Sequence, residues 1–305
     1  MTADLAASLQ AQYQPDWVMR AQGHGEVLPG SGLRIEFLAK GSADPCTLHP
    51  DLALLLSTSG TTGSPKLVKL SYAAVQANAA SIAQYLQLGA QERALTVLPA
   101  SYSYGLSVIN SHLQAGSTLV LRDVSVLSPA FVQTLRQQSV SSIAGVPYTY
   151  QMLYRTGFHK QDFATLRTLT QAGGRLDDRL TQTFSIAATE KGWKFFVMYG
   201  QTEATARISY IPPERLASKI GSIGIAIPGG ELSLDSQSNE LLYRGANVMM
   251  GYATCRNDLA RGDELNGLLR TGDIAKQVLA GASVSYENAA GASGAPATIK
   301  IGETV

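Results

Sequence analysis

Hydroxyl side chains, glycines and a lysine gather in one short stretch, Leu56–Lys66, which reads LSTSGTTGSPK. Glycines let backbone N–H groups approach a ligand closely, and consecutive N–H groups form a concave site for anions. The hydroxyl groups add hydrogen-bond donors, and Lys66 adds a positive charge. The stretch therefore predicts a loop that cradles a polyphosphate. The simpler alternative for this composition is a surface turn rich in Ser, Thr and Gly.

This loop differs from the P-loop of many nucleotide-binding proteins. The P-loop reads GxxxxGK[ST], and its lysine lies at the start of a helix. Here Lys66 follows Pro65 and precedes Leu67–Leu70, which alternates like a strand. The apolar run Leu52–Leu56 before the loop also indicates a buried strand. We therefore predict a hairpin whose loop covers the phosphates.

A second stretch, Met198–Ala204, reads MYGQTEA and carries side chains that suit a nucleotide. Tyr199 offers a flat face for a base, and Gly200 lets the backbone turn. Thr202 can donate a hydrogen bond to a phosphate, and Glu203 is a hard oxygen ligand of the kind that Mg²⁺ prefers. Taken alone, a glutamate after a threonine is more often a solvated loop residue.

Three further stretches have the right residue types but are less specific. Gly173 and Gly174 follow a predicted strand and open a helix. Glycines at such a position allow a ligand to approach closely, and the start of a helix favours anions. A tight turn is the simpler explanation. The stretch LRTGD ends at Asp273, whose carboxylate can accept hydrogen bonds from both hydroxyls of a ribose. Tyr102 lies in PASYSYGL, where a strand meets a helix; packing against the core is an equal alternative for it.

Taken together, these motifs resemble the adenylate-forming superfamily, which includes acyl- and aryl-CoA synthetases, luciferases and the adenylation domains of peptide synthetases. STSGTTGSPK resembles its phosphate loop, YGQTE its YGxTE motif and RTGD its motif of the same letters. The resemblance covers roughly residues 51–276. It implies that an ATP-dependent ligase forms an acyl adenylate from a carboxylic acid and releases pyrophosphate, with Mg²⁺ as the metal. It also implies a thiol acceptor, coenzyme A or the pantetheine of a carrier protein.

The resemblance also implies a set of site residues. The nucleotide-binding residues would be Thr58, Ser59, Gly60, Thr61, Thr62, Gly63, Lys66, Gly174, Tyr199, Gly200, Thr202 and Asp273. The catalytic residues would be Thr202, Glu203 and Lys66, with Glu203 as the metal ligand, and the acyl pocket would include Tyr102, Gly173 and Gly174.

Strands and helices alternate along the middle of the chain, which is typical of a mostly parallel sheet with helices on both faces. Ligands of such sheets bind beyond the carboxyl ends of the strands, where the candidate residues fall. Strands are predicted at Arg93–Leu98, Ser117–Leu121, Ser142–Val146, Leu166–Gln171 and Trp193–Met198. Helices are predicted at Tyr72–Leu88 after an N-cap at Ser71, at Ser103–Ala115, at Pro129–Gln138, from Pro147 and at Leu176–Lys191.

The predicted fold is therefore α/β, and changes in composition and pattern along the sequence divide it into four regions. Residues 1–50 are interpreted as the remnant of a preceding α/β subdomain, and 51–206 as the nucleotide-binding core. Residues 207–276, with short strands and frequent glycines, predict a smaller antiparallel β subdomain. Residues 277–305, rich in Ala, Gly and Ser, predict a low-complexity tail. The resemblance implies αβαβα layers like those of the N-terminal domain of acyl-CoA synthetases.

Composition excludes several other classes of function. The 305 residues carry 24 Lys and Arg against 23 Asp and Glu, so the formal net charge of +1 predicts no nucleic-acid and no membrane partner. The two cysteines and four histidines show no metal-binding or disulfide spacing, which suits a reducing compartment. No stretch approaches the ~20 apolar residues of a membrane helix. We therefore predict a cytoplasmic location.

In the resembled family, the RTGD motif is followed by a hinge and a mobile C-terminal domain that supplies a lysine near the reacting carboxylate. Residues 277–305 match neither, so the chain resembles the N-terminal core of the family truncated at both ends. One alternative is therefore a non-catalytic or split nucleotide-binding fragment that needs a separate C-terminal domain chain. A third possibility is a structural α/β protein with no ligand.

Overall fold

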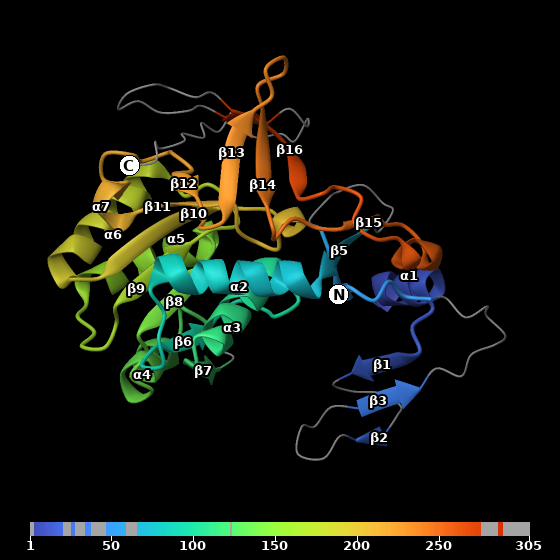
Figure 1. Ribbon diagram of the computed structural model, residues 1–305. Helices are drawn as coiled ribbons and strands as arrows, with labels where there is room; N and C mark the ends of the chain where they lie inside the picture. The colour runs from blue at the N-terminus through green and yellow to red at the C-terminus, as the bar shows by residue number, and fades with distance from the viewer. Residues whose placement is uncertain are drawn as a thin grey trace.

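The computed structural model describes residues 3–20, 26–27, 34–37, 47–58, 66–122, 124–275 and 286–288 (Figure 1). A seven-stranded sheet lies at its centre, in the order β12-β11-β10-β9-β8-β6-β7. Its strands are β6 (Arg93–Thr96), β7 (Thr118–Leu121), β8 (Ser142–Gly145), β9 (Thr168–Gln171), β10 (Lys194–Tyr199), β11 (Ser209–Ile211) and β12 (Ile225–Ala226). The strands from β6 to β10 pair in parallel, whereas β11 and β12 continue the sheet in antiparallel register. The predicted α/β class is confirmed.

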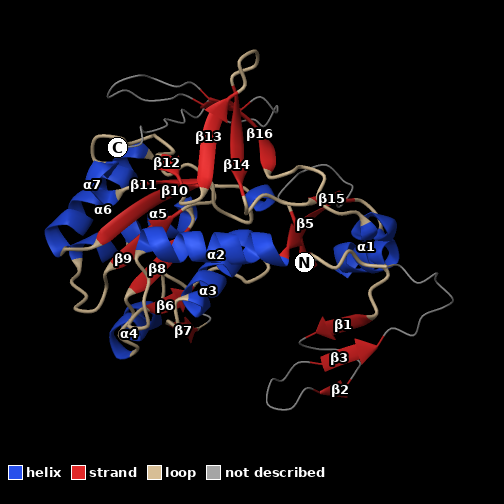
Figure 2. Ribbon diagram, in the orientation of Figure 1, coloured by secondary structure: helices blue, strands red, loops and turns tan. Residues whose placement is uncertain are grey.

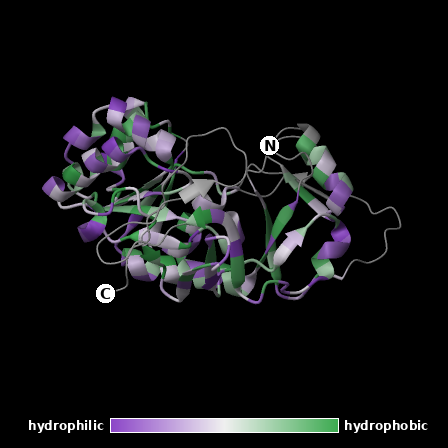
Figure 3. Ribbon diagram, turned by 90° about the horizontal axis from the view of Figure 1, so that it is seen from above, coloured by the Kyte–Doolittle hydropathy of each residue, from purple (hydrophilic) through white to green (hydrophobic). Residues whose placement is uncertain are grey.

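The helices are α1 (Ala3–Tyr13), α2 (Tyr72–Leu86), α3 (Ser103–Gln114), α4 (Pro129–Gln137), α5 (Pro147–Arg155), α6 (Asp178–Lys191) and α7 (Pro213–Leu216). Helices α2 to α7 lie against this sheet, whereas the N-terminal helix α1 lies away from it (Figure 2). Figure 3 shows that the peripheral helices carry both hydrophilic and hydrophobic stretches, as expected for helices that bury one side against a sheet.

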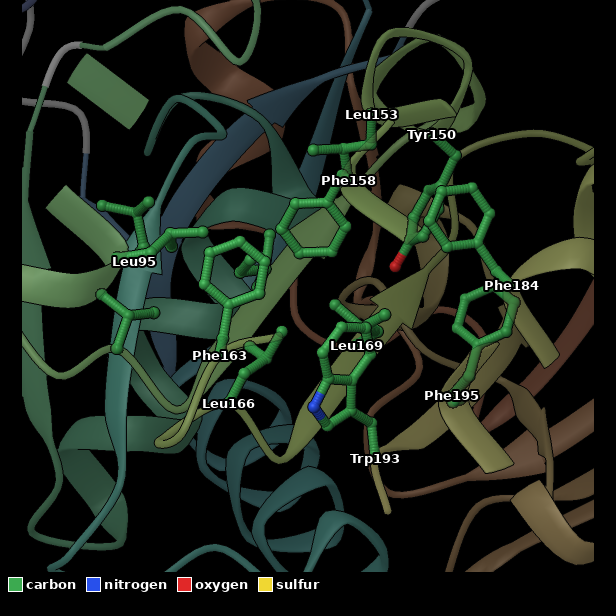
Figure 4. Close-up of a cluster of buried hydrophobic side chains, with 14 of the residues drawn as sticks. Leu95, Tyr150, Leu153, Phe158, Phe163, Leu166, Leu169, Phe184, Trp193 and Phe195 are labelled. Carbon is green, nitrogen blue, oxygen red and sulfur yellow. The ribbon is translucent and has the colours of Figure 1, made fainter. Parts of the chain in front are cut away.

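Side chains alternate between the two faces of the central strands, and both faces of the sheet are buried. On β8, Ile143 packs in one hydrophobic cluster and Ala144 in the other. On β10, Phe195 and Phe196 divide in the same way. The first cluster holds aromatic and aliphatic side chains from α4, α5 and α6 (Figure 4), and the second holds side chains from α2 and α3. Helices therefore cover both faces, as the alternating pattern predicts.

Smaller antiparallel sheets surround the central one. A four-stranded sheet has the order β13-β14-β16-β17, a three-stranded sheet the order β15-β5-β4, and a second three-stranded sheet the order β1-β3-β2. Their strands are β1 (Trp17–Arg20), β2 (Glu26–Val27), β3 (Arg34–Phe37), β4 (Leu52–Ser57), β5 (Leu67–Ser71), β13 (Gly230–Leu234), β14 (Glu240–Gly245), β15 (Gly251–Ala253), β16 (Leu268–Ala275) and β17 (Tyr286–Asn288). The predicted hairpin is present, because β4 and β5 pair antiparallel with Ser57 opposite Leu67.

Sheet membership does not follow the predicted regions. The strands β11 and β12 fall within 207–276, yet they extend the central sheet, because Tyr199 and Ser209 are paired and Ser209 also pairs with Ala226. Conversely, β15 pairs with β5 in the hairpin sheet. In the predicted tail, β17 pairs with β16, and the rest of 277–305 lies outside the described residues. Backbone pairing between segments distant in sequence decides these sheets, and local composition does not encode it.

The predicted helix limits are accurate to about two residues. Ser71 caps α2, since its hydroxyl oxygen accepts a hydrogen bond from the Ala74 N–H at 3.0 Å. The helix ends at Leu86 rather than Leu88, because Gln87 takes a left-handed conformation with φ 57°. In α6, Asp177 is the N-cap, so this helix begins two residues later than predicted.

Asp258 ties the segment after β15 together and makes its stability depend on pH. Its buried Oδ2 accepts hydrogen bonds from the Thr254 N–H at 2.7 Å, the Thr254 hydroxyl at 2.8 Å and the Cys255 N–H at 3.2 Å. These bonds, the Thr254 N–H first, lower the pKa of Asp258 from 3.8 to about 2. The carboxylate therefore stabilises the fold above pH 3.8, and this stabilisation is lost as the pH falls toward 2.

We accordingly expect Asp258→Asn to lower the free energy of unfolding at pH 7. The difference from the parent should shrink as the pH falls from about 4 to about 2, because protonation removes the same charge from the parent. Urea unfolding of both proteins at pH 7, 4 and 3 measures this difference. An unchanged difference across the three pH values would show that the charge of Asp258 contributes nothing.

Candidate nucleotide-binding site

Several of the predicted site residues lie where parallel strands of the central sheet end. Tyr102 follows β6, Gly173 and Gly174 follow β9, and Gly200 follows β10. Side chains at the carboxyl ends of neighbouring parallel strands meet at one edge of a sheet, which is where α/β proteins bind ligands. This shared edge explains why residues about 100 positions apart in sequence can contribute to one site.

Asp273 joins two of the predicted motifs directly. Its Oδ2 accepts a hydrogen bond from the Tyr199 hydroxyl, and a second from the Gln201 side-chain amide at 3.1 Å. The same amide donates to the Thr271 backbone oxygen at 2.8 Å. Tyr199 at the end of β10 and Asp273 in β16, 74 residues apart, are thus joined by a side-chain hydrogen bond. Sequence reasoning did not identify Gln201, because nothing in its motif distinguishes it from a spacer residue.

Glu203, Tyr252 and Lys66 form a second cluster. The Tyr252 hydroxyl donates to Glu203 Oε1 at 2.8 Å, and Lys66 Nζ lies 3.9 Å from the centre of the Tyr252 ring. Burial first, and then the charge of Glu203, raise the pKa of Tyr252 well above its usual value, so the phenol stays a proton donor at neutral pH. Tyr252 thus connects Lys66, at the end of the predicted phosphate loop, to Glu203, the predicted metal ligand. Tyr252 is not among the predicted site residues, because its partners Glu203 and Lys66 lie far from it in sequence.

Thr202 is held by the first turn of α3. Its hydroxyl lies 3.1 Å from the Ser103 hydroxyl, a hydrogen-bond distance, and either oxygen can be the donor. Ser103 is buried and follows Tyr102, whereas Thr202 opens the 3₁₀ turn Thr202–Ala204. This contact fixes the direction of the Thr202 side chain. Ser103 was not among the predicted site residues; its place beside a predicted pocket residue was the available signal.

The two predicted pocket elements lie against each other. A Cβ atom added at Gly173, where φ is +76°, would lie 2.4 Å from the Tyr102 hydroxyl oxygen. At Gly174, where φ is +141°, a Cβ would lie 3.3 Å from Pro147. Both glycines combine a backbone conformation that other residues rarely adopt with close neighbours. Gln171 fixes the turn further, since its side-chain amide donates to the Gly174 backbone oxygen at 2.8 Å.

Gly200 is required by a close approach of two backbone segments. A Cβ at this position would lie 2.0 Å from the Ala206 backbone oxygen and 2.9 Å from the Arg207 Cα. The chain returns over Gly200 through Thr205 and Ala206, whose φ values are 54° and 98°. Positive φ at non-glycine residues is uncommon, so this return is strained locally.

The predicted phosphate loop is described only at its two ends. Thr58 follows β4 and Lys66 precedes β5, and the pairing of Ser57 with Leu67 brings these ends side by side. The remaining predicted loop residues, Ser59, Gly60, Thr61, Thr62 and Gly63, lie outside the described residues. Lys66 is exposed apart from its contact with the Tyr252 ring.

The donor set fits Mg²⁺ only together with a nucleotide. Among the described residues no three His, Cys, Asp or Glu side chains gather into a metal-binding group. Glu203 therefore offers one carboxylate, beside the hydroxyl of Tyr252. Protein sites for nucleotide-bound Mg²⁺ commonly supply one or two carboxylates and take the other oxygens from phosphates and water. The residues present suit that kind of site rather than a closed protein cage.

Within the described part of the chain, none of the helices has the length and apolar character needed to cross a membrane.

Comparison with known proteins gives concordant matches. The family model described as "AMP-binding enzyme" matches residues 6–253. A feruloyl-CoA synthase from Amycolatopsis sp. is 30% identical over 214 residues, which are 66% of this chain and 42% of that protein. A 2-succinylbenzoate–CoA ligase from Bacillus pumilus is 31% identical over 231 residues, which are 73% of this chain and 46% of that protein.

Solved structures agree with these relatives. The O-succinylbenzoate coenzyme A synthetase from Bacillus subtilis, in complex with ATP and magnesium ion, aligns with a TM-score of 0.62 and 27% identity. The alignment covers 75% of this chain and 48% of that one. The chain thus spans about half the length of the relatives that it matches.

Proposed function

The chain belongs to the AMP-binding enzyme family, and from this premise we propose that it uses ATP to activate a carboxylic acid as an acyl adenylate. The observation that carries the proposal is the junction at Asp273, where Tyr199 and Gln201 from the YGQTE stretch both donate to the aspartate of RTGD. Two stretches with the residue types of a nucleotide site are therefore in direct contact, at the ligand-binding edge of an α/β sheet.

In the proposed reaction, a carboxylate oxygen of the acid attacks the α-phosphorus of ATP. A P–O bond to the acid forms, the bond from the α-phosphorus to the bridging oxygen breaks, and pyrophosphate leaves with that oxygen. The acyl group of the resulting mixed anhydride is then transferred to a thiol, and AMP is released. Coenzyme A or a carrier-protein pantetheine is the proposed acceptor, and a separate C-terminal domain chain is a possible further partner.

The residues take roles that suit their positions. Asp273 would accept hydrogen bonds from the ribose, and Tyr199 would lie against the adenine. Thr202, oriented by Ser103, would donate to the α-phosphate. The Thr58–Lys66 loop would hold the β- and γ-phosphates. Tyr102, Gly173, Gly174 and Gly200 would shape the space for the base and the acyl group.

Glu203 is the proposed ligand for Mg²⁺ and remains ordered by the Tyr252 hydroxyl. When bound, the metal would neutralise negative charge on the phosphates. Lys66 would add a second positive charge on the same side, since it contacts the ring of Tyr252. The chain's own contribution is mainly to position the reactants and to place charge where it is needed.

The proposal is tested by carboxylate-dependent exchange of pyrophosphate into ATP, with a panel of fatty, aryl and amino acids. Exchange with one class of acid would support the proposed reaction and identify the substrate class. ATP binding without exchange by any acid would instead favour a nucleotide-binding unit whose chemistry needs another chain. Absence of ATP binding would contradict both and favour a protein without a nucleotide ligand.

A further inference from the structure

Arg207 is a buried cation without an acidic partner. Its side chain is 2% exposed, and it is the largest by volume of the fully buried side chains in the described part of the chain. Within that part, no carboxylate forms an ion pair with it and its Nε has no hydrogen-bond partner. One guanidinium nitrogen donates to the Ala206 backbone oxygen at 3.2 Å. Because arginine stays charged in proteins, burying it in this way is costly.

Two tyrosines contact the guanidinium group. Its carbon lies 4.1 Å from the centre of the Tyr104 ring, a cation–π distance. The Tyr104 hydroxyl donates to the Thr170 backbone oxygen at 2.9 Å. The Tyr85 hydroxyl donates to the sulfur of Met198 at 3.0 Å. Tyr85 also forms a side-chain hydrogen bond with Arg207. The neighbours of the guanidinium are therefore neutral, and no carboxylate pairs with it among the described residues.

The backbone is strained to place Arg207 at this position. Thr205 and Ala206 precede it with φ values of 54° and 98°. Asn247 locks this strained segment: its side-chain amide donates to the backbone oxygens of Ala204 at 2.7 Å and Arg207 at 2.8 Å. Strain that several contacts hold in place is typical of functional positions rather than of ordinary packing.

The guanidinium lies next to the proposed acyl pocket. Tyr104 follows Ser103, which contacts Thr202, and the Tyr102 ring packs edge-on against Tyr104 with 6.3 Å between centres. Tyr102 is half-buried, and its hydroxyl makes no hydrogen bond within the described part of the chain. A rotation of this side chain would therefore break no hydrogen bond. Such a rotation would move the Tyr102 ring away from Gly173 and from Tyr104.

We propose that Arg207 binds a second carboxylate of the acid substrate, remote from the carboxylate that reacts, so that the substrates are dicarboxylic acids. This inference rests on the proposed function. A guanidinium can form two parallel hydrogen bonds with a carboxylate, and at a buried position these bonds compensate the desolvation of both groups. Monocarboxylic acids would leave the buried charge unbalanced and bind more weakly. Arg207 is thus a specificity residue of the acyl pocket.

The test compares matched acids that differ by one carboxylate: hexanoate with hexanedioate, and benzoate with the benzenedicarboxylates. Thermal unfolding of the full chain, with ATP and Mg²⁺ present, gives a half-saturating concentration for each acid. The parent should prefer the dicarboxylate of a pair by roughly 10-fold or more. Arg207→Met should abolish this preference, and Arg207→Lys should keep part of it. Arg215→Met, which removes an exposed arginine, should leave it unchanged.

The unfolding temperature of the chain without ligand gives a second readout. If the charge of Arg207 is compensated only when a ligand is bound, Arg207→Met should unfold at the same temperature as the parent or at a higher one. The methionine has a similar size and removes the uncompensated charge. No dicarboxylate preference in the parent, or a preference that Arg207→Met retains, would overturn the inference. ATP binding by the parent, measured separately, distinguishes this inference from the proposed function. A parent that binds ATP but does not prefer dicarboxylates refutes this inference alone. A parent that does not bind ATP refutes the proposed function.

Discussion

Replacing Glu203 with glutamine should lower carboxylate-dependent ATP–pyrophosphate exchange by roughly 100-fold or more, which corresponds to about 2.7 kcal/mol of transition-state stabilisation. The amide has the shape of the carboxylate but not its charge, so it is a poor ligand for Mg²⁺. The bond from Tyr252 places the carboxylate but cannot replace its charge. If the parent binds ATP without exchange, the Mg²⁺-dependent part of its ATP affinity should be lost in the variant instead.

The matched control is Tyr252→Phe, which removes the hydrogen bond to Glu203 but keeps the carboxylate and the ring beneath Lys66. We expect the exchange activity of this variant to fall by roughly 10-fold at most, because a single hydrogen bond contributes less than the metal ligand. Exchange that continues at ordinary Mg²⁺ concentrations in Glu203→Gln would contradict the assignment. An equal fall in exchange activity in the two variants would show that Glu203 and Tyr252 act by keeping the structure in place rather than by binding the metal.

Replacing Gly200 with alanine should destabilise the fold more than almost any other change of one methyl group. The added Cβ would lie 2.0 Å from the Ala206 backbone oxygen, and backbone at a strained turn cannot move aside easily. We expect a loss of about 3 kcal/mol in the free energy of unfolding and a fall of roughly 5 to 10 °C in the unfolding temperature. Thermal and urea unfolding of the purified variant measure both quantities.

Gly89→Ala is the appropriate control for that result. Its added Cβ would also be crowded, at 2.7 Å, but by the end of the flexible Gln91 side chain, which can rotate away. We expect a cost below about 1 kcal/mol for this variant. If Gly200→Ala were as stable as Gly89→Ala, the segment from Thr205 to Arg207 would not pack over Gly200 as described.

Local sequence patterns predicted most of the central sheet and its helices. The hydroxyl of Ser71 caps α2 where a serine precedes an Ala-rich apolar repeat, and Pro147 opens α5 as a proline at the first turn should. The strands β8 and β10 were recognisable because apolar residues fill both of their faces, as in a buried parallel sheet. These features depend only on residues near one another in sequence.

What the sequence did not predict depends on contacts between distant segments. The pairing of β15 with β5 places Tyr252 beside Lys66, although 186 positions separate the two residues. The roles of Gln201 and Ser103 likewise became visible only through their partners, Asp273 and Thr202. Arg207 carried no signal in the sequence at all, since its burial without an acidic partner is a property of the folded chain.

The central claim is that Thr202, Glu203 and Asp273 belong to one site for ATP and Mg²⁺. Isothermal titration of the chain with ATP, with and without Mg²⁺, tests this most directly, with Asp273→Asn alongside the parent. The account predicts saturable one-to-one binding that Mg²⁺ strengthens and that Asp273→Asn weakens by roughly 10-fold or more, because a charge-assisted acceptor for the ribose is lost. Absence of saturable binding, or binding that neither Mg²⁺ nor Asp273 affects, would contradict it.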